Sequence, residues 1–205
     1  MSKRPLVNKH NQHGYKHRNV DTRKIRERFL IVCEGERTEP NYFECFRVPK
    51  SVIDIDVRGC GYNTVSLVKK AIDLQSQESY DQVWCVFDRD SFPAQKFNEA
   101  LSLAKCNNIK IAYSNEAFEI WYLLHFNYYK TAMTRSDYYD RLSELLVKKY
   151  KKNQEDMYTL LEPKQSSAIR NAKKLLSQYT PTNPERDNPS TTVHLLVEQL
   201  NRFIM

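Results

Sequence analysis

Two apolar segments of this chain each end directly in acidic residues. Residues 29–33 (FLIVC) lead into Glu34, and residues 83–87 (VWCVF) lead into Asp88 and Asp90. Continuous apolar runs of about five residues, rich in β-branched and aromatic side chains, are typical of strands buried on both faces of a parallel sheet. Ligands of such sheets bind at the carboxyl ends of the strands. The sequence therefore predicts that these acids emerge together at one edge of a sheet.

Acids gathered in this way need a positive partner. Glu34, Asp88 and Asp90, joined by Glu39 a few residues further on, would repel one another unless a cation lay between them. Carboxylates and water are the ligands that Mg²⁺ prefers, and Mn²⁺ suits the same donors. We therefore expect these four acids to be metal ligands. A structural alternative stays open, because acids after strands also form turns and helix caps, and Asp90 could cap a helix that begins near Pro93.

Strand and helix patterns alternate through the first half of the chain. Residues 52–57 and 109–113 are typical of two further strands, the first of them nearer a sheet edge. Apolar residues at helical spacing predict helices over 40–46, from a cap at Asn63 or Thr64, and over 93–106. This alternation indicates an α/β fold with a mainly parallel sheet of four strands flanked by helices.

The second half of the chain has a different character. From Glu116 onward only helices are expected, with Ser190 as the cap of the last one. The helices are predicted near 116–126, 136–150, 163–178 and 190–203. A chain of 205 residues can bury one good core. We expect a flexible basic arm over 1–27, an α/β core over 28–126 and a helical extension packed on that core over 127–205.

The N-terminal segment carries the excess of positive charge. The first 28 residues hold nine lysines and arginines against Asp21 and Glu27, and this difference of seven equals the formal net charge of the whole chain, +7. With few apolar residues and no periodicity, the segment is expected to be extended until it is bound. A basic arm can neutralise the phosphates of RNA or DNA, although a merely solubilising tail is the alternative. The candidate nucleic-acid contacts are Lys9, Lys16, Arg18, Arg23, Lys24, Arg26 and, between the acids, Arg37.

The predicted helix over 116–126 contains a charged residue in a segment that is apolar nearly all round. Such a helix is expected to be buried, and a buried ionised Glu119 is costly unless it is paired or liganded. The helix follows the fourth strand, so Glu119 is a candidate catalytic residue at the edge where the acids gather. The alternative is a structural ion pair with an arginine. His125 is expected to be a core histidine rather than a proton-transfer group.

Several function classes are excluded by composition. With four glycines the chain has no GxxxxGK[ST] phosphate loop, which argues against ATP hydrolysis of the P-loop type. Its five cysteines form no CxxC pair, which argues against zinc and disulfide frameworks. No apolar run approaches the length of a membrane span, and the N-terminus is too basic and polar for a secretory signal. We expect a cytoplasmic protein with reduced thiols and no membrane part.

Four segments resemble a known family. An acid after the first strand and a DxD pair after a later one resemble the Toprim fold of topoisomerases, primases and OLD-type nucleases. The nearer resemblance is to the RloB family, Toprim-related proteins associated with bacterial phage defence and restriction loci. The segments are IVCEGERTEPNYF (31–43), FDRD (87–90), SNEAFEIW (114–121) and NPST (188–191). Together they span most of the chain after residue 27.

The resemblance and the acids together favour a Mg²⁺-dependent phosphodiesterase that acts on nucleic acid in phage defence. Asp88 and Asp90 would hold the metal, and Glu34 would be a further ligand or the general acid/base. Glu39 would lie behind these ligands or bind a second ion, and Arg37 would steady the developing charge or bridge the acids.

Two other functions stay open. The acids could bind a structural ion in a catalytically silent module that docks on nucleic acid or on a partner. The RloB resemblance implies that this partner is a separate ATPase. The protein could also hydrolyse a phosphate on a nucleotide, although a small substrate needs no long cationic guide. The sequence leaves the choice of RNA or DNA and the oligomeric state undecided.

Overall fold

Both apolar segments form neighbouring strands in the middle of one sheet. The structure is a computed structural model that describes residues 26–90 and 93–204. Strand β1 (Glu27–Cys33) and strand β3 (Gln82–Asp88) run in parallel, with Cys33 opposite Val86. Their apolar residues are almost fully buried because helices cover both faces of the sheet. The two strands consequently end side by side.

The sheet has the order β2-β1-β3-β4-β5. Strand β2 (Ile53–Gly59) lies at an edge, as predicted, and strand β4 (Lys110–Asn115) lies beyond β3, each parallel to its neighbour. The α/β class and the mainly parallel sheet are confirmed. The predicted number of four strands is too low, because the two-residue strand β5 (Ser190–Thr191) pairs with β4 in the antiparallel sense.

Strand β5 also corrects one predicted helix cap. Ser190 lies opposite Asn115 in the sheet, so it does not cap the last helix. Helix α8 (Val193–Asn201) begins only after Thr192. A strand of two residues has no periodicity, and the Asn-Pro-Ser-Thr sequence at 188–191 is equally typical of a helix start.

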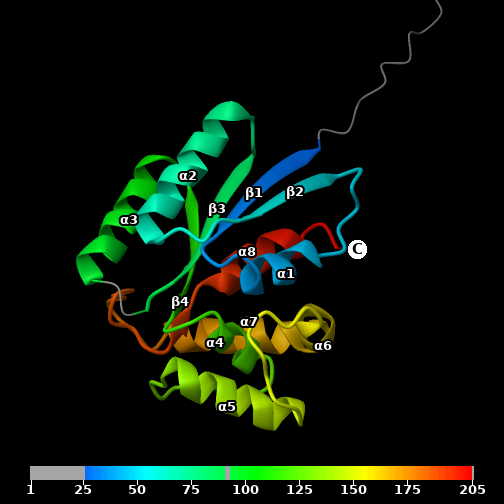
Figure 1. Ribbon diagram of the computed structural model, residues 1–205, viewed down its shortest axis with the longest axis vertical. Coiled ribbons are helices and arrows are strands. Elements are labelled where there is room, and N and C mark those ends of the chain that lie inside the picture. The colour runs from blue at the N-terminus through cyan, green and yellow to red at the C-terminus, as the bar shows by residue number, and fades with distance from the viewer. Residues whose placement is uncertain (1–25, 91–92, 205) are drawn as a thin grey trace, which may run out of the picture.

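Each face of the sheet has its own hydrophobic core. Leu30 and Val32 face helices α2 (Thr64–Gln77) and α3 (Ala94–Cys106). Phe29, Ile31 and Cys33 face the opposite side. That side is covered by α1 (Thr38–Glu44), α4 (Glu119–Leu124), α7 (Gln165–Leu176) and α8 (Figure 1). The later helices therefore share one core with β1 and β3 rather than forming a separate one.

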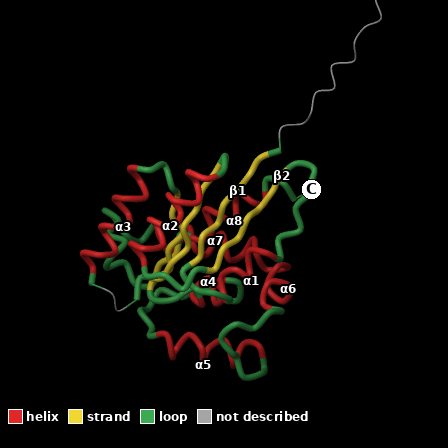
Figure 2. The backbone as a smooth tube through the Cα atoms, turned by 45° about the horizontal axis from the view of Figure 1, so that its top comes forward, coloured by secondary structure: helices red, strands yellow, loops and turns green. Residues whose placement is uncertain are grey.

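Two helix starts matter for the site. The side chain of Asn63 accepts a hydrogen bond from the Ser66 N–H at 3.3 Å, which makes Asn63, of the two predicted candidates, the cap of α2. Helix α5 (Arg135–Leu146) begins at a capping box formed by Thr134 and Asp137. Figure 2 shows α5 lying apart from the sheet, beyond α4. The box fixes where α5 begins, which makes Arg135 the first residue of the helix.

The segment between α5 and α7 contains one element that the sequence pattern does not reveal. Helix α6 (Met157–Leu161) runs through a 3₁₀ turn (Glu162–Lys164) into α7. Five residues are too few to show a helical period, although Met157, Tyr158 and Leu161 are buried against α1. None of the helices in the described ranges is both long and apolar enough to cross a membrane.

Candidate active site

The strand register brings Glu34 against Asp88. Glu34 follows β1, and its N–H donates to the carbonyl oxygen of Val86 on β3 at 2.9 Å. The backbone N–H of Asp88 in turn donates to Oε2 of Glu34 at 3.0 Å. The side chain of Glu34 therefore lies across the end of β3, where the main chain of Asp88 holds it.

Glu39 reaches the same place from helix α1. It is 5% exposed, and its carboxylate packs against Gly35. A Cβ atom at position 35 would collide with Oε2 of Glu39. A larger residue at position 35 would therefore displace the carboxylate end of Glu39.

Two cations from the helical part of the chain lie beside these acids. Nη2 of Arg135 lies 3.3 Å from Oδ2 of Asp88 and 3.6 Å from Oδ2 of Asp90. Lys152 contributes to the wall of the same cavity. Asp90 does not cap α3, because the N-cap residue there is Pro93. Its carboxylate instead shares Arg135 with Asp88.

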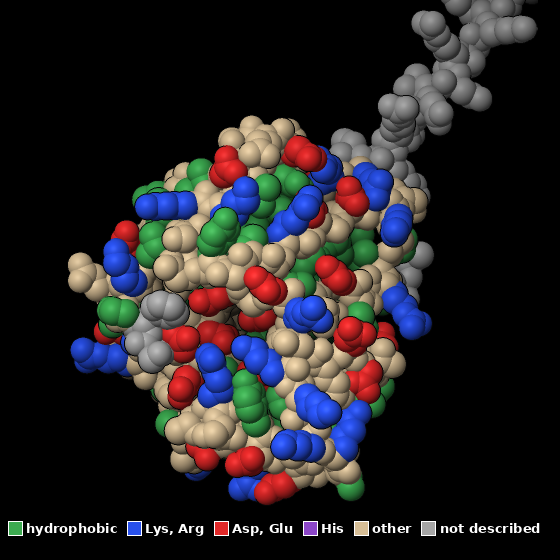
Figure 3. Space-filling model, viewed as in Figure 1, with side chains coloured by type: hydrophobic (Ala, Val, Ile, Leu, Met, Phe, Trp, Pro, Cys, Tyr) green, Lys and Arg blue, Asp and Glu red, His purple; other side chains and the backbone are tan. Residues whose placement is uncertain are grey.

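A cavity of about 440 Å³ contains the four predicted metal ligands, Glu34, Glu39, Asp88 and Asp90. We call it the acidic cavity. Its remaining wall residues are Gly35, Gly61, Tyr62, Asn63, Arg135 and Lys152. Acidic side chains gather around a hollow in the middle of one face of the molecule, with basic side chains beside them (Figure 3). Glu119 and Arg37 do not line this cavity. Arg37 is exposed at the start of α1.

Burial of several acids together makes their negative charge costly. Desolvation raises the pKa of Glu34 to about 7, and the nearby charges of Asp90 and Glu39 act in the same direction. The pKa of Asp88 is raised well above its usual range by burial and by Glu39 and Glu119, although Arg135 opposes this. Burial likewise raises the pKa of Glu39. A group with a pKa near 7 is suited to exchange protons at physiological pH.

The donor chemistry of the acidic cavity fits a hard divalent cation. Oδ1 of Asp88 is buried and has no hydrogen-bond partner among the described residues, and an orphaned carboxylate oxygen is a ready ligand. However, the described ranges contain no group of three or more Asp, Glu, His or Cys side chains arranged so that they could hold one metal ion. The guanidinium of Arg135 supplies a positive charge beside Asp88 and Asp90.

Glu119 is deeply buried, but an arginine is not its partner. It is 3% exposed, and the hydroxyl of Tyr150 donates to its Oε1 at 3.0 Å. No ion pair within 4.0 Å reaches it from the described part of the chain, so the predicted structural ion pair is not found. Burial raises the pKa of Glu119, which favours a neutral, hydrogen-bonded carboxyl group.

His125 is a core residue, as expected. It is 1% exposed, Nδ1 lies 2.8 Å from the carbonyl oxygen of Trp121, and burial lowers its pKa to about 4. The ring is therefore neutral at physiological pH.

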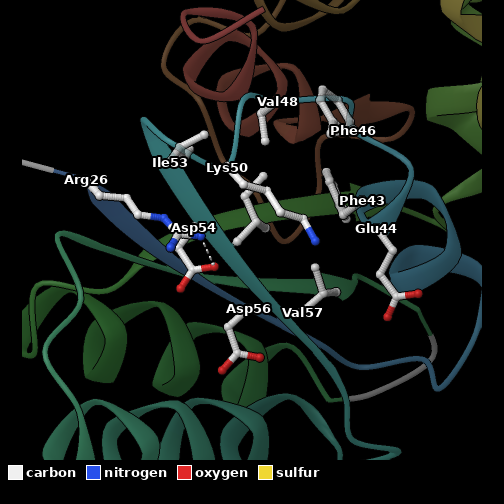
Figure 4. A pocket seen from close by; sticks show the side chains of 11 residues that line it. Arg26, Phe43, Glu44, Phe46, Val48, Lys50, Ile53, Asp54, Asp56 and Val57 are labelled. Carbon is white, nitrogen blue, oxygen red and sulfur yellow. Dashed lines mark hydrogen bonds and ion pairs between the residues drawn. The ribbon is translucent and has the colours of Figure 1, made fainter. Parts of the chain in front are cut away.

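The predicted nucleic-acid contacts are mostly outside the described residues. Lys9, Lys16, Arg18, Arg23 and Lys24 precede residue 26, where the description begins. Arg26 pairs with Asp54 on β2 at 3.1 Å. It also lines a groove of about 450 Å³ along β2, where the side chain of Lys50 extends between Phe43 and Val57 (Figure 4). This groove contains none of the acids of the acidic cavity, so it is not part of the candidate site.

Two residues of the acidic cavity, Arg135 and Lys152, and the hydrogen-bond partner of Glu119, Tyr150, were missed by reasoning from the sequence. Arg135 had one usable signal, since the Thr134-Asp137 capping box marks a helix start, but nothing local places that helix near β3. Lys152 belongs to a basic run at 148–152 that is typical of a solvated helix end. Tyr150 lies within the same run. All three depend on long-range packing of the helical part against the sheet.

Comparison with known proteins identifies the family of this chain. The sequence profile of the family described as RloB-like protein matches residues 29–200. The chain belongs to the RloB-like family. The match covers β1 through α8, so it includes every residue of the acidic cavity in this RloB-like chain. Neither the curated proteins nor the solved structures contain a significant match.

Stability should depend on pH through Glu34. Burial raises the pKa of Glu34 from 4.5 to about 7. The free energy of unfolding that protonated Glu34 contributes is therefore fully present below about pH 4.5 and is lost as pH rises through 7. Glu34→Gln should remove up to about 3 kcal/mol of the gain in unfolding free energy between pH 8 and pH 5. Urea melts at both pH values measure this, with the exposed Glu155→Gln as control. An unchanged pH dependence would contradict the burial of Glu34.

The bond between Tyr150 and Glu119 gives a second stability prediction. Tyr150→Phe should cost about 1–3 kcal/mol, because it leaves a buried carboxyl oxygen without its donor. Glu119→Gln keeps an acceptor for Tyr150 and should change stability by less than about 1 kcal/mol. Tyr139→Phe, which alters the neighbouring ring, is the control in denaturant melts. A loss of about 3–5 kcal/mol in Glu119→Gln would instead indicate a buried ion pair.

Proposed function

We propose that this RloB-like protein is a divalent-metal-dependent phosphodiesterase that cleaves nucleic acid in phage defence, with a Toprim-like arrangement of its acids. The observation that carries the proposal is the meeting of Glu34, Glu39, Asp88 and Asp90 in one cavity at the carboxyl ends of parallel strands. Ligands bind at this edge in α/β sheets, and acids with raised pKa values in a cavity are typical of catalytic sites.

Asp88 and Asp90 would hold a Mg²⁺ or Mn²⁺ ion, with Glu39 behind them or at a second ion. A bound ion would neutralise charge on the scissile phosphate and make water more acidic. Glu34 would take the proton of the attacking water, since its pKa of about 7 lets it accept and release a proton near neutral pH. Its Oε2 already accepts the Asp88 N–H, so Oε1 is the oxygen assigned to this transfer.

Arg135 and Lys152 have a second role in this proposal. A phosphate entering the acidic cavity must pass close to carboxylates that repel it. Both cations line the cavity and would offset this repulsion. Arg135 would exchange its contacts with Asp88 and Asp90 for contacts with a phosphate oxygen when a metal ion takes over the two carboxylates.

The test is cleavage by the purified protein. Transfer RNA, single-stranded DNA and duplex DNA are incubated with and without Mg²⁺ or Mn²⁺. Asp88→Asn should reduce metal-dependent cleavage at least about 100-fold, in line with the loss of one group that stabilises transition-state charge. It should also abolish the rise in melting temperature that a bound metal gives. Asp73→Asn, at an exposed ion pair on α2, is the control. Equal cleavage by the Asp88 variant would refute the assignment.

A catalytically silent module is the second candidate, and one observation favours it. The guanidinium of Arg135 already offsets the negative charge of Asp88 and Asp90, so the fold does not require a metal ion at these carboxylates. In that case the protein would bind nucleic acid or a separate ATPase partner without cleaving anything. Metal-independent binding together with an absence of products in every incubation would support this function over the first.

The basic N-terminal segment is proposed to guide nucleic acid. Residues 1–25 hold seven lysines and arginines against one acid, Asp21. A truncation should end at residue 25, because β1 begins at Glu27. It should weaken binding to duplex DNA and lower the log–log salt slope by about 0.9 for each phosphate that the segment neutralises.

Binding measured across a salt series checks this prediction. A full-length control with glutamine in place of the basic residues separates charge from chain length. The residues replaced are Lys9, Lys16, Arg18, Arg23 and Lys24. Unchanged affinity and slope in the truncated protein would assign the segment to a solubilising role.

A further inference from the structure

A second cavity adjoins the acidic cavity and shares Asp90 with it. Its volume is about 300 Å³, at the lower end of the range for small-ligand sites. We call it the amide cavity, because Asn115 and Asn188 line it, together with the arginines Arg89 and Arg186 and the acids Asp90, Glu116 and Glu185. No apolar side chain lines it in the described part of the chain. A ligand of this cavity must therefore be polar and able to form hydrogen bonds.

Two of the family-like segments that the proposed chemistry does not use contribute Asn115 and Asn188 to the amide cavity. Asn115 ends β4 and Asn188 precedes β5, and the two strands pair through Asn115 and Ser190. The Asn115 side chain is fixed, because its Nδ2 donates to the carbonyl oxygen of Asp187 at 3.1 Å. Its backbone carbonyl accepts a bond from the Tyr138 hydroxyl at 3.2 Å. The wall of the cavity is thus held in place from both sides.

Asn188 carries the feature that points to a ligand. Its Oδ1 atom is buried and has no hydrogen-bond partner among the described residues. An amide oxygen buried in this way costs free energy unless a ligand or water donates to it. Asparagine side chains are among the groups that read base edges, where exocyclic amino groups are the donors.

The two arginines differ in how they are held. Nε of Arg89 donates to the carbonyl oxygen of Glu185 at 3.1 Å, and its guanidinium lies 5.6 Å from the centre of the Phe97 ring. The Arg186 side chain is 79% exposed and contacts its neighbour Glu185. Arg89 is therefore a fixed part of the wall, whereas Arg186 stands at the rim, where a phosphate would enter.

We propose that the amide cavity binds the nucleotide next to the scissile phosphate, with Asn188 at the base edge and Arg186 at a phosphate. This inference rests on the proposed function, because Asp90 joins the cavity to the acids that would cleave. Oδ1 of Asn188 accepts a hydrogen bond, so the position favours a base with an exocyclic amino group. Adenine, cytosine and guanine have one, whereas uracil and thymine do not.

The experiment maps cleavage in oligonucleotide pools, one of RNA and one of DNA, with all four bases beside each cleavage site. The wild-type protein should prefer amino-bearing bases at one adjacent position by at least about fivefold, the size expected for one good base contact. Asn188→Ala should abolish the preference while cleavage continues. Asn188→Asp keeps an acceptor and should retain it. The exposed Asn127→Ala is the control. A preference that survives in Asn188→Ala overturns the inference.

A binding experiment separates this inference from the proposed function. In the Asp88→Asn background, fluorescence polarisation compares short adenine and uracil oligomers, and their DNA counterparts. Adding Asn188→Ala should remove at least about fivefold of discrimination between the two bases. If the protein cleaves no nucleic acid in any incubation, it can still discriminate between the two bases in a way that Asn188→Ala removes. That result would support base recognition by the amide cavity and refute the proposed phosphodiesterase activity. Equal binding of both oligomers before the Asn188 change overturns the inference.

Discussion

The placement of negative charge at the end of two buried strands governs the rest of this structure. Glu34 and Asp88 are brought together by the pairing of β1 with β3. Burial of such charges is unfavourable unless they are protonated, paired or liganded. The chain uses the first two of these means, since the pKa of Glu34 is raised and Arg135 contacts Asp88.

The helical part of the chain is needed for this compensation. Arg135 comes from α5 and Lys152 from the loop before α6, yet both line the acidic cavity at the sheet. Tyr150 in the same region donates to Glu119, the buried carboxyl group of α4. A sheet without these helices would leave its acids without Arg135 and Lys152, and would leave α4 without cover. The helical part therefore serves both the core and the electrostatics of the site.

Sequence patterns predicted local features well and long-range ones poorly. The buried strands, the edge position of β2 and the acids at the strand ends follow from apolar runs and from the geometry of parallel sheets. Asn63 could be named as a cap because a cap is a local hydrogen bond. The partners of the acids could not be named, because Arg135 and Lys152 lie 47 and 64 positions after Asp88 and approach it only through tertiary packing. Strand β5 was missed for a similar reason, since its two residues form a strand only against β4.

The antiparallel pair of β4 and β5 has a consequence for the order in which the molecule is completed. Asn115 and Ser190 are neighbours in the sheet but lie 75 positions apart in the chain (190 − 115). Chains emerge from the ribosome from the N-terminus, and domains fold as units. All four acids of the acidic cavity have been synthesised by residue 90, whereas Arg135, Lys152 and Asn188 follow much later. A nascent chain consequently carries its acids before it has the cations and the wall that surround them.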